Sequence, residues 1–128
     1  MNPTAIEYLE DLNSLKGLIL SVEYPKIDAI VALKRSGWII GAYLSNQLTI
    51  PVFTVSEIDS IPEEFSNILV VDDKIWSGKS IKKVVNKIKR KNIITAVLYL
   101  EKGYRDITDI FIREIPRKGC RMWYENNN

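Results

Sequence analysis

The sequence predicts an α/β protein in which a parallel sheet of about five strands is flanked by helices. Two runs lead to this prediction: residues 27–33 (IDAIVAL) are apolar apart from one acid, and residues 68–71 (ILVV) are apolar throughout. Parallel strands that are covered on both faces have this composition. Segments with helical spacing separate these runs from further short apolar runs. The resulting strand–helix–strand order is typical of an open parallel sheet with helices on both faces.

The first element expected is a helix. Thr4 and Glu7 have the spacing of a capping box, and aliphatic residues recur on one side, namely Ile6, Leu9, Leu12 and Leu15. The other elements follow along the chain: a strand at 27–33, a helix at 37–48, a strand at 51–55, a polar segment at 56–67, a strand at 68–71, a basic helix at 79–91, and strands at 94–102 and 110–115. We expect these strands, numbered along the chain, to lie in the order 3-2-1-4-5. One domain, 1–128, then has a core at about 27–102 and a small C-terminal hood at about 103–125.

Composition excludes several classes of function. The 128 residues include one cysteine and no histidine, which rules out a disulfide framework, a structural zinc site and serine–histidine or cysteine–histidine catalysis. No apolar run approaches the roughly 20 residues of a membrane helix. Acids stand near the N-terminus where a signal peptide would be basic, so we expect a cytoplasmic protein.

Charge is uneven along the chain. Residues 79–91 hold seven of the eighteen basic residues and no acid, although the net charge is only +2. We interpret this run as the solvated face of an amphipathic helix, with a weak attraction for phosphate-rich ligands as the alternative. A nucleic-acid partner is not expected from so small a net charge.

Two segments should meet at the carboxyl ends of the strands, where open parallel sheets bind ligands near the reversal of strand order. One is Lys34-Arg35-Ser36-Gly37, after the first strand, and the other runs from Asp72 to Ser80, after the third. The second segment is not a P-loop, because Asp73 occupies the position of the glycine that such a loop requires. It is not a phosphoacceptor receiver either, because the next strand ends in Leu100-Glu101-Lys102 without an aspartate.

A third interpretation fits the chemistry of NILVVDDKIWSGKSIKKV (67–84). The adjacent carboxylates of Asp72 and Asp73 can accept hydrogen bonds from two vicinal hydroxyls. A glycine turn into a helix offers backbone N–H groups and a positive dipole end to a phosphate, and Ser77 and Ser80 can add hydroxyl donors. The segment resembles the ribose-phosphate signature of type I phosphoribosyltransferases: an apolar strand, two acids, three variable residues, Thr/Ser-Gly-x-Thr/Ser and a helix.

Two further segments carry the resemblance. IDAIVALKRSGWIIGAYLSNQLTIPV (27–52) is similar to the first strand, pyrophosphate loop and helix of that family. LYLEKGYRDITDIFIREIP (98–116) resembles its hypoxanthine, guanine and xanthine branch, in which a lysine ends the fourth strand and a later strand ends in an acidic-Ile-Pro sequence. Here these are Lys102 and Glu114-Ile115-Pro116.

The resemblance implies a role for each matching residue. Asp72 and Asp73 would bind the ribose and act in catalysis, Arg35 would contact the diphosphate, and Lys102 would contact the 6-oxo group of the base. The binding site for phosphoribosyl pyrophosphate would comprise Lys34, Arg35, Ser36, Gly37, Asp72, Asp73, Lys74, Ile75, Trp76, Ser77, Gly78, Lys79 and Ser80.

The sequence departs from the family at three places. Trp76 occupies the position of an aspartate that handles the proton on purine N7, and indole cannot accept a proton there. Only residues 56–67 stand where the family inserts a long hairpin that closes over the reacting centre. Cys120 falls where a base-stacking aromatic residue belongs, and Trp123 could supply that ring or simply pack over the sheet.

The function implied is transfer of a 5-phosphoribosyl group from phosphoribosyl pyrophosphate to a nitrogenous base, a 6-oxopurine such as hypoxanthine, guanine or xanthine, as in purine salvage. Mg²⁺ would be carried by the diphosphate and ribose oxygens, with no direct protein ligand. Because family members commonly dimerise, a homodimer is expected. The alternative is a catalytically reduced regulatory module of the same fold, which binds phosphoribosyl pyrophosphate or a nucleotide without turnover.

Overall fold

The computed structural model describes residues 3–21, 26–75, 78–90 and 92–115, and it confirms the predicted α/β class. Five parallel strands form one sheet: β1 (Ala29–Ala32), β2 (Val52–Thr54), β3 (Asn67–Ile75), β4 (Asn92–Glu101) and β5 (Ile110–Ile115). Three α-helices, α1 (Ala5–Ser21), α2 (Lys34–Leu48) and α3 (Lys79–Lys87), and two 3₁₀ helices, η1 (Val55–Ser60) and η2 (Arg105–Ile107), complete the described elements. None of the described helices is long and apolar enough to cross a membrane.

The strand order is β2-β1-β3-β4-β5, so the order that we expected is wrong for the first three strands. β1 lies between β2 and β3, with Val31 level with Phe53 on one side and with Val70 on the other. The reason is burial. β2 is short and only half buried, which suits an edge, whereas the apolar run of β3 is covered on both faces and needs a neighbour on each side.

Two boundaries differ from the sequence prediction in ways that affect the site. Helix α2 begins at Lys34 rather than at residue 37, so the expected loop 34–37 is the first turn of a helix. Strand β3 continues to Ile75, so Asp72 and Asp73 lie within the strand instead of after it. Strand pairing extends β3 and helical hydrogen bonding extends α2. A run of apolar residues in the sequence indicates neither.

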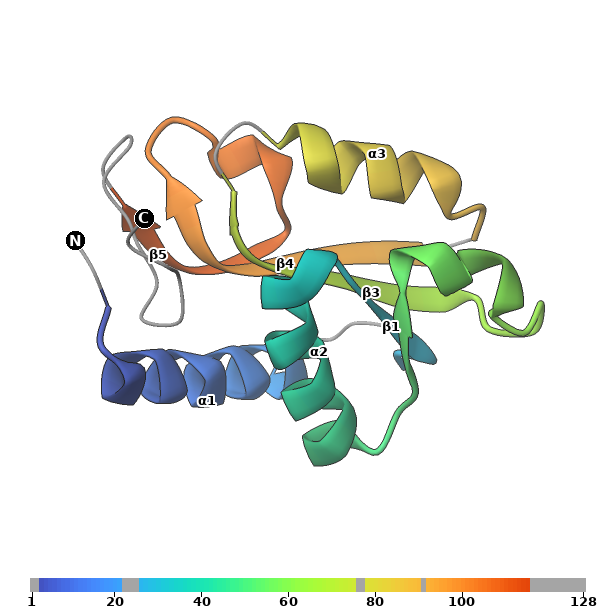
Figure 1. Ribbon diagram of the computed structural model, residues 1–128, viewed down its shortest axis with the longest axis horizontal. Helices are drawn as coiled ribbons and strands as arrows, with labels where there is room; N and C mark the ends of the chain where they lie inside the picture. Colours follow the sequence, from blue (N-terminus) through green and yellow to red (C-terminus); the bar gives the residue numbers. More distant parts are fainter. Residues whose placement is uncertain (1–2, 22–25, 76–77, 91, 116–128) are drawn as a thin grey trace.

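The two faces of the sheet bury separate cores. Helices α1 and α2 cover one face, and α3 and η1 cover the other, so that the sheet lies between two helical layers (Figure 1). Alternate residues of β3 enter opposite cores: Leu69 and Val71 face α1 and α2, and Ile68 and Val70 face α3. This alternation explains why the strand is apolar at every position.

Helix α1 confirms the capping box but corrects the expected apolar side. Thr4 N–H donates to Glu7 Oε1 and Glu7 N–H donates to Thr4 Oγ1, both at 3.1 Å. Leu12 and Leu15 are buried, whereas Ile6 and Leu9 are 70 % and 58 % exposed. A spacing of three residues falls about 60° short of a full helical turn at each step. The series therefore moves around the helix from its outer face to its inner face.

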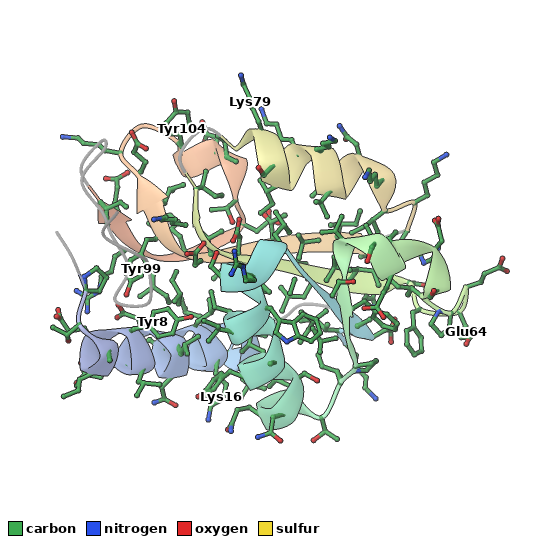
Figure 2. All side chains as sticks on the ribbon, viewed as in Figure 1. Tyr8, Lys16, Glu64, Lys79, Tyr99 and Tyr104 are labelled. Atoms are coloured by element: carbon green, nitrogen blue, oxygen red, sulfur yellow. The ribbon has the colours of Figure 1, made fainter. Side chains whose placement is uncertain are left out.

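A buried polar cluster fixes α1 to the sheet. Asp11 is 2 % exposed, and its Oδ2 accepts a hydrogen bond of 2.5 Å from the hydroxyl of Tyr99 in β4. Arg113 of β5 donates from Nε to both oxygens of the same carboxylate, at 3.0 and 2.9 Å. The hydrogen bond to Asp11 raises the pKa of Arg113 above its usual value. Figure 2 shows Tyr99 reaching from the sheet toward α1, beside Tyr8.

Removal of the Tyr99 hydroxyl tests this cluster. Tyr99→Phe should lower the free energy of unfolding by about 1–3 kcal/mol, because the Asp11 carboxylate stays buried with one donor fewer. Urea unfolding followed by circular dichroism measures the change. Tyr43→Phe, on a half-buried side chain of α2, is the control and should change stability by less than about 0.5 kcal/mol. Equal effects of the two substitutions would refute a specific role for the Asp11–Tyr99 pair.

Candidate functional site

The strand order places the candidate site between β1 and β3. From β1 the chain passes through α2 to β2 on one side, and from β2 it returns through η1 to β3 on the other side. β1 and β3 pair in parallel, with Ala32 level with Val71, so their carboxyl ends are adjacent. Crevices for ligands form at such reversals in open α/β sheets. The two segments that the sequence singled out, 34–37 and 72–80, both begin there.

Gly37 and Asp72 bring these two segments into contact. A Cβ atom added at Gly37 would lie 3.1 Å from the carbonyl oxygen of Val71 and 3.2 Å from Oδ1 of Asp72. The first turn of α2 therefore packs directly on the end of β3. A side chain at position 37 would require these neighbours to shift by a few tenths of an ångström.

The paired acids are held by the backbone around them. Asp72 and Asp73 are 7 % and 4 % exposed. Asp72 Oδ1 accepts the N–H of Asp73 at 2.8 Å, and Asp73 Oδ1 accepts the N–H of Lys74, also at 2.8 Å. These short-range bonds fix the orientation of each carboxylate relative to the strand end. The orientation of each carboxylate is therefore set by the chain itself.

The turn between β3 and α3 depends on Gly78. Its φ is +75°, in the left-handed region, and a Cβ atom there would lie 2.6 Å from Cγ2 of Ile107 in η2. Gly78 is therefore required by backbone conformation and by close packing together. The same contact joins the segment after β3 to the segment after β4.

The two α-helices that begin at this edge, α2 and α3, lack side-chain caps at their N-termini. Neither Leu33 before α2 nor Gly78 before α3 makes a side-chain cap, and neither first turn contains an acid. Arg35 and Lys79 stand there instead, both exposed, and Lys79 points outward from α3 (Figure 2). By contrast, α1 has a glutamate that caps its first turn, and so does the 3₁₀ helix η1, which begins at the carboxyl end of β2. N-terminal N–H groups without caps, flanked by cations, favour an anion.

Lys102 follows β4 directly, whereas the sequence predicted that it would be the last residue of the strand. Its backbone N–H donates to the carbonyl oxygen of Ile115 at 2.8 Å, and its side chain is exposed. Glu101, the last residue of β4, is buried. The base-reading role of Lys102 stays a prediction, since this position is equally that of a solvated residue at the end of a strand.

The connection from β2 to β3 is short and fixed at both ends. At its start, Thr54 N–H donates to Glu57 Oε1 at 2.9 Å, and hydrogen bonds from the backbone and side chain of Thr54 hold the pKa of Glu57 below its usual value. At its end, Arg90 donates from Nε to the carbonyl oxygen of Phe65 at 3.0 Å and from Nη2 to that of Ile61 at 2.9 Å. All residues of 55–66 are described, and they include no strand pair. The short connection that the sequence predicted between these two strands is therefore confirmed.

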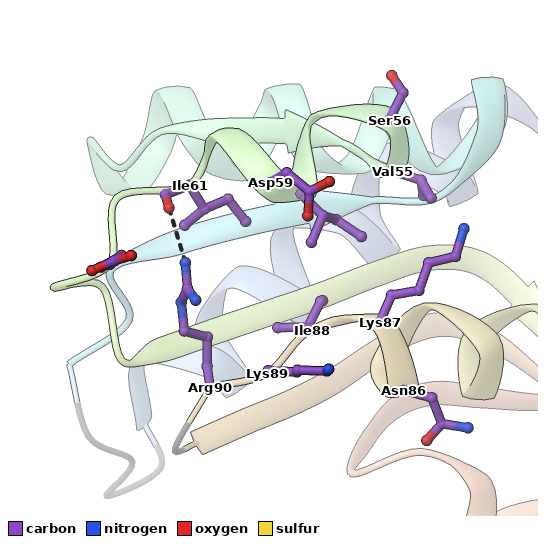
Figure 3. Close-up of a pocket in the computed structure, with 11 residues that line it drawn as sticks. Val55, Ser56, Asp59, Ile61, Asn86, Lys87, Ile88, Lys89 and Arg90 are labelled. Carbon is purple, nitrogen blue, oxygen red and sulfur yellow. Dashed lines mark hydrogen bonds between the residues drawn. The ribbon is translucent and has the colours of Figure 1, made fainter.

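A groove of about 780 Å³ lies beside this connection, between η1 and the C-terminal end of α3 (Figure 3). Its floor is apolar, with Ile58, Ile61 and Ile88, and its described lining includes none of the predicted site residues. Figure 3 shows Arg90 at one end, bonded to the carbonyl of Ile61. The groove and the candidate site are therefore separate features.

Several predicted residues lie outside the described part of the chain. These are Trp76, Ser77, Cys120 and Trp123, with Pro116 and the C-terminal part of the predicted hood, and of Lys34 the side chain is not described. The described part of the hood comprises η2 and the edge strand β5.

Two structural features were missed by sequence reasoning: the cap at the carboxyl end of β2, and the arginine that contacts the segment before β3. The Thr54–Glu57 cap has the Thr-x-x-Glu spacing that identified the cap of α1, so the same rule would have found it. Arg90 carried no such signal, because it stands in a run of lysines that indicated a solvated surface. Its distinction from the lysines is its planar guanidinium, which can serve several carbonyls at once.

The comparisons with known proteins give different results for the sequence and for the fold. The sequence matches no model of a known protein family and no curated protein. Its structure matches the xanthine-guanine-hypoxanthine phosphoribosyltransferase of Helicobacter pylori with a TM-score of 0.83 and 21% identity, over 97% of this chain and 92% of the other. A purine phosphoribosyltransferase from Pyrococcus horikoshii gives 0.82 and 22%, over 100% and 95%.

The chain has the type I phosphoribosyltransferase fold. A hypothetical protein from Neisseria gonorrhoeae with bound ppGpp also matches, with a TM-score of 0.73 and 18% identity, over 98% of this chain and 89% of the other. At these identities the likeness concerns the phosphoribosyltransferase fold. The resemblance inferred from the motif at 67–84 is confirmed at that level.

The turn at Gly78 gives a direct test of the local geometry. Gly78→Ala should lower the free energy of unfolding by about 1–3 kcal/mol, because alanine is strained at a positive φ and its Cβ would collide with Ile107. Thermal and urea unfolding measure this cost.

The same substitution in an Ile107→Ala background separates the two causes. Removal of the Ile107 side chain abolishes the collision but not the strain, so the cost of Gly78→Ala should become smaller while staying above zero. A cost that is the same in both backgrounds would show that packing against Ile107 is unimportant.

Proposed function

We propose that this protein is a phosphoribosyltransferase that transfers the 5-phosphoribosyl group of phosphoribosyl pyrophosphate to a 6-oxopurine and releases pyrophosphate. The observation that carries the proposal is the pair of uncapped, cation-flanked helix N-termini on either side of two buried, adjacent carboxylates. A ligand with a phosphate at each end and vicinal hydroxyls between them matches this set of partners. The fold is the one seen in two purine phosphoribosyltransferases.

The proposed roles follow the geometry of the edge. The first turn of α2, with Arg35 and Gly37, would bind the diphosphate, and the turn at 78–80 would bind the 5′-phosphate. Asp72 and Asp73 would accept hydrogen bonds from the ribose hydroxyls. Lys102, at the end of β4, would contact the exocyclic oxygen of the base. A base nitrogen bonds to C1 of the ribose as the bond from C1 to the diphosphate oxygen breaks, and the proton on that nitrogen leaves with solvent.

These residues would act by position and charge. Backbone N–H groups and Arg35 stabilise the negative charge that develops on the departing diphosphate, and the carboxylates hold the ribose in line with the base. As the resemblance implies, Mg²⁺ would be held largely by oxygens of the ligand, where it would neutralise diphosphate charge. We place this chemistry in the cytoplasm.

A second function is favoured by the fixed connection between β2 and β3. Hydrogen bonds at Thr54 and Arg90 hold the segment where the family carries a mobile hairpin. Without closure, water can reach the reacting centre. The alternative is a regulatory module that binds phosphoribosyl pyrophosphate or a nucleotide without turnover, and the match to a protein with bound ppGpp supports it.

A panel of bases distinguishes the two functions. The protein is incubated with phosphoribosyl pyrophosphate and Mg²⁺, with and without adenine, hypoxanthine, guanine or xanthine, and pyrophosphate release is measured. Release that depends on a 6-oxopurine supports the enzyme. Binding by calorimetry without release supports the regulatory module, and absence of binding would refute both.

The ribose site is tested by Asp73→Asn. Asparagine keeps the oxygen that accepts the N–H of Lys74, so the fold should be retained, but the negative charge is lost. Affinity for phosphoribosyl pyrophosphate should fall by about 1–3 kcal/mol, the cost of losing hydrogen bonds to a charged group. Asp59→Asn, on the exposed η1 helix, is the matched control and should leave affinity unchanged. Calorimetry that finds the same affinity for Asp73→Asn and the wild type would remove Asp73 from the site.

The base site is tested by Lys102→Met. A lysine ammonium has donors only, so it favours an exocyclic oxygen over the amino group of adenine. Mispaired buried groups cost about 1–3 kcal/mol, so hypoxanthine should be preferred to adenine by roughly one to two orders of magnitude. Lys102→Met should remove most of this preference, while Lys83→Met, on the exposed side of α3 and outside the predicted site, serves as the control. If the preference survives in Lys102→Met, another residue reads the base.

A further inference from the structure

The groove between η1 and the C-terminal end of α3 is a cavity that the proposed function does not use. Its volume of about 780 Å³ falls within the range of roughly 300–1,000 Å³ that is usual for small-molecule sites. Its described lining comes from η1, from the segment that follows η1 and from residues 86–90 (Figure 3). The size of the groove therefore suits a small ligand.

The floor of the groove is apolar and fixed in place. It contains Ile61 and Ile88, which are 3 % and 4 % exposed, and the half-buried Val55 and Ile58. All four belong to the core on the α3 side of the sheet or pack against it. An apolar ring that covers these side chains is removed from water together with them, which favours binding.

The two walls of the groove carry opposite charges that do not meet. Lys87 and Lys89 line the side of α3, and Asp59 and Glu63 line the opposite side. All four residues are exposed, and among the described residues none of the four takes part in an ion pair. Figure 3 shows Lys87 extending from α3 toward Val55. Opposite charges that are kept apart by an apolar floor leave room for a ligand with an anionic end and a hydrogen-bond-donating end.

Arg90 adds a third cation at one end of the groove. Its guanidinium is held by the carbonyl oxygens of Phe65 and Ile61, at 3.0 and 2.9 Å. The described lining thus has three basic and two acidic side chains, with the basic ones on residues 87–90. An anion is therefore attracted to the α3 wall and repelled by the opposite wall.

We propose that this groove is a second ligand site, which binds a nucleoside monophosphate. The phosphate lies against the two lysines of the α3 wall, the base covers the isoleucines of the floor, and donors of the sugar and base reach the acids of the opposite wall. The proposal is independent of the proposed function, because the groove and the predicted site have no described residue in common.

The groove suits a nucleotide better than a peptide or a sugar phosphate. An extended peptide binds by adding a strand to a free sheet edge, whereas the walls here belong to a 3₁₀ helix and an α-helix. A bound peptide helix needs apolar anchors over two turns or more, and this floor is one cluster with charges on both sides. A sugar phosphate has no ring to cover the floor. A nucleoside monophosphate supplies phosphate, hydroxyls and ring in one molecule.

Methyl NMR of the full chain locates the site directly. AMP is the probe, because the predicted base site disfavours adenine. The δ1-methyl signals of Ile58, Ile61 and Ile88 should shift saturably, and Ile107, which packs against Gly78, reports on the predicted phosphate turn in the same spectrum. Asp73→Asn should leave the groove titration unchanged, so the two sites can fail separately. Unchanged groove methyls up to about 1 mM AMP, or shifts confined to Ile107, would overturn the proposal.

Lysine variants test the phosphate contact. Lys87→Gln combined with Lys89→Gln should lower the affinity of the groove for AMP about tenfold, because charge-assisted contacts to the phosphate are lost. Lys82→Gln combined with Lys83→Gln is the matched control, since both lysines are exposed on α3 and lie outside the lining. The control should bind AMP as the wild type does. Equal losses in the two double variants would show a general attraction for anions and refute a site in the groove.

Fragments of the probe test the contribution of each wall and of the floor. Adenosine lacks the phosphate and ribose 5-phosphate lacks the base, so each should bind at least about tenfold more weakly than AMP. If ribose 5-phosphate binds as AMP does, the floor takes no part. If adenosine binds as AMP does, the lysines take no part. Either result would overturn the assignment of a nucleotide to the groove.

Discussion

The pairing of β1 with β3 is the constraint on which the rest of this molecule depends. It sets the reversal of strand order, and it brings the ends of two strands that are far apart in the sequence into adjacent positions. For this pairing to be useful, α2 must leave β1 and lie flat against β3. Two glycines make that possible: Gly37 approaches Asp72, and a Cβ atom at Gly41 would lie 2.7 Å from Cβ of Ala32. The glycines that weaken α2 as an isolated helix are the residues that let it pack.

The fold class could be predicted from the sequence because strands that are buried on both faces appear there as continuous apolar runs. Every residue of β1, and β3 from Ile68 to Asp73, is buried, and the apolar runs reveal this directly. No comparable pattern in the sequence indicates the order of the strands. The strand order depends on which strand can lie at an edge of the sheet. The half-buried state of β2, which suits an edge, is seen only in the structure. Apolar periodicity likewise misled at α1, where a three-residue spacing moved from the outer face to the inner one.

The residues of the candidate site could be predicted from the sequence, whereas the residues that hold α1 against the sheet could not. Asp72, Asp73 and Gly78 were found because they stand in a pattern of adjacent letters. The groups that hold the frame are scattered: Asp11 is separated from Tyr99 by 88 positions and from Arg113 by 102. No local pattern predicts such partners, since each residue alone is an ordinary acid, tyrosine or arginine. Only the packing of α1 on β4 and β5 brings them together.

The proposed function makes two demands, ligand binding and exclusion of water, and these concern different parts of the structure. At the carboxyl edge of the sheet, backbone N–H groups hold the carboxylates of Asp72 and Asp73, and neither α2 nor α3 has a side-chain cap at its N-terminus. The connection that would have to move in order to cover them is held by Arg90 through carbonyls at both ends of its last turn. Hydrogen bonds that involve a charged donor contribute about 1.5–3 kcal/mol each, so closure by this segment would have to offset their loss. Under the proposed function, ligand affinity would therefore follow from the resting structure, whereas turnover would depend on a cover supplied by something other than residues 55–66. The rate of the proposed reaction would then be set by how completely that cover excludes water.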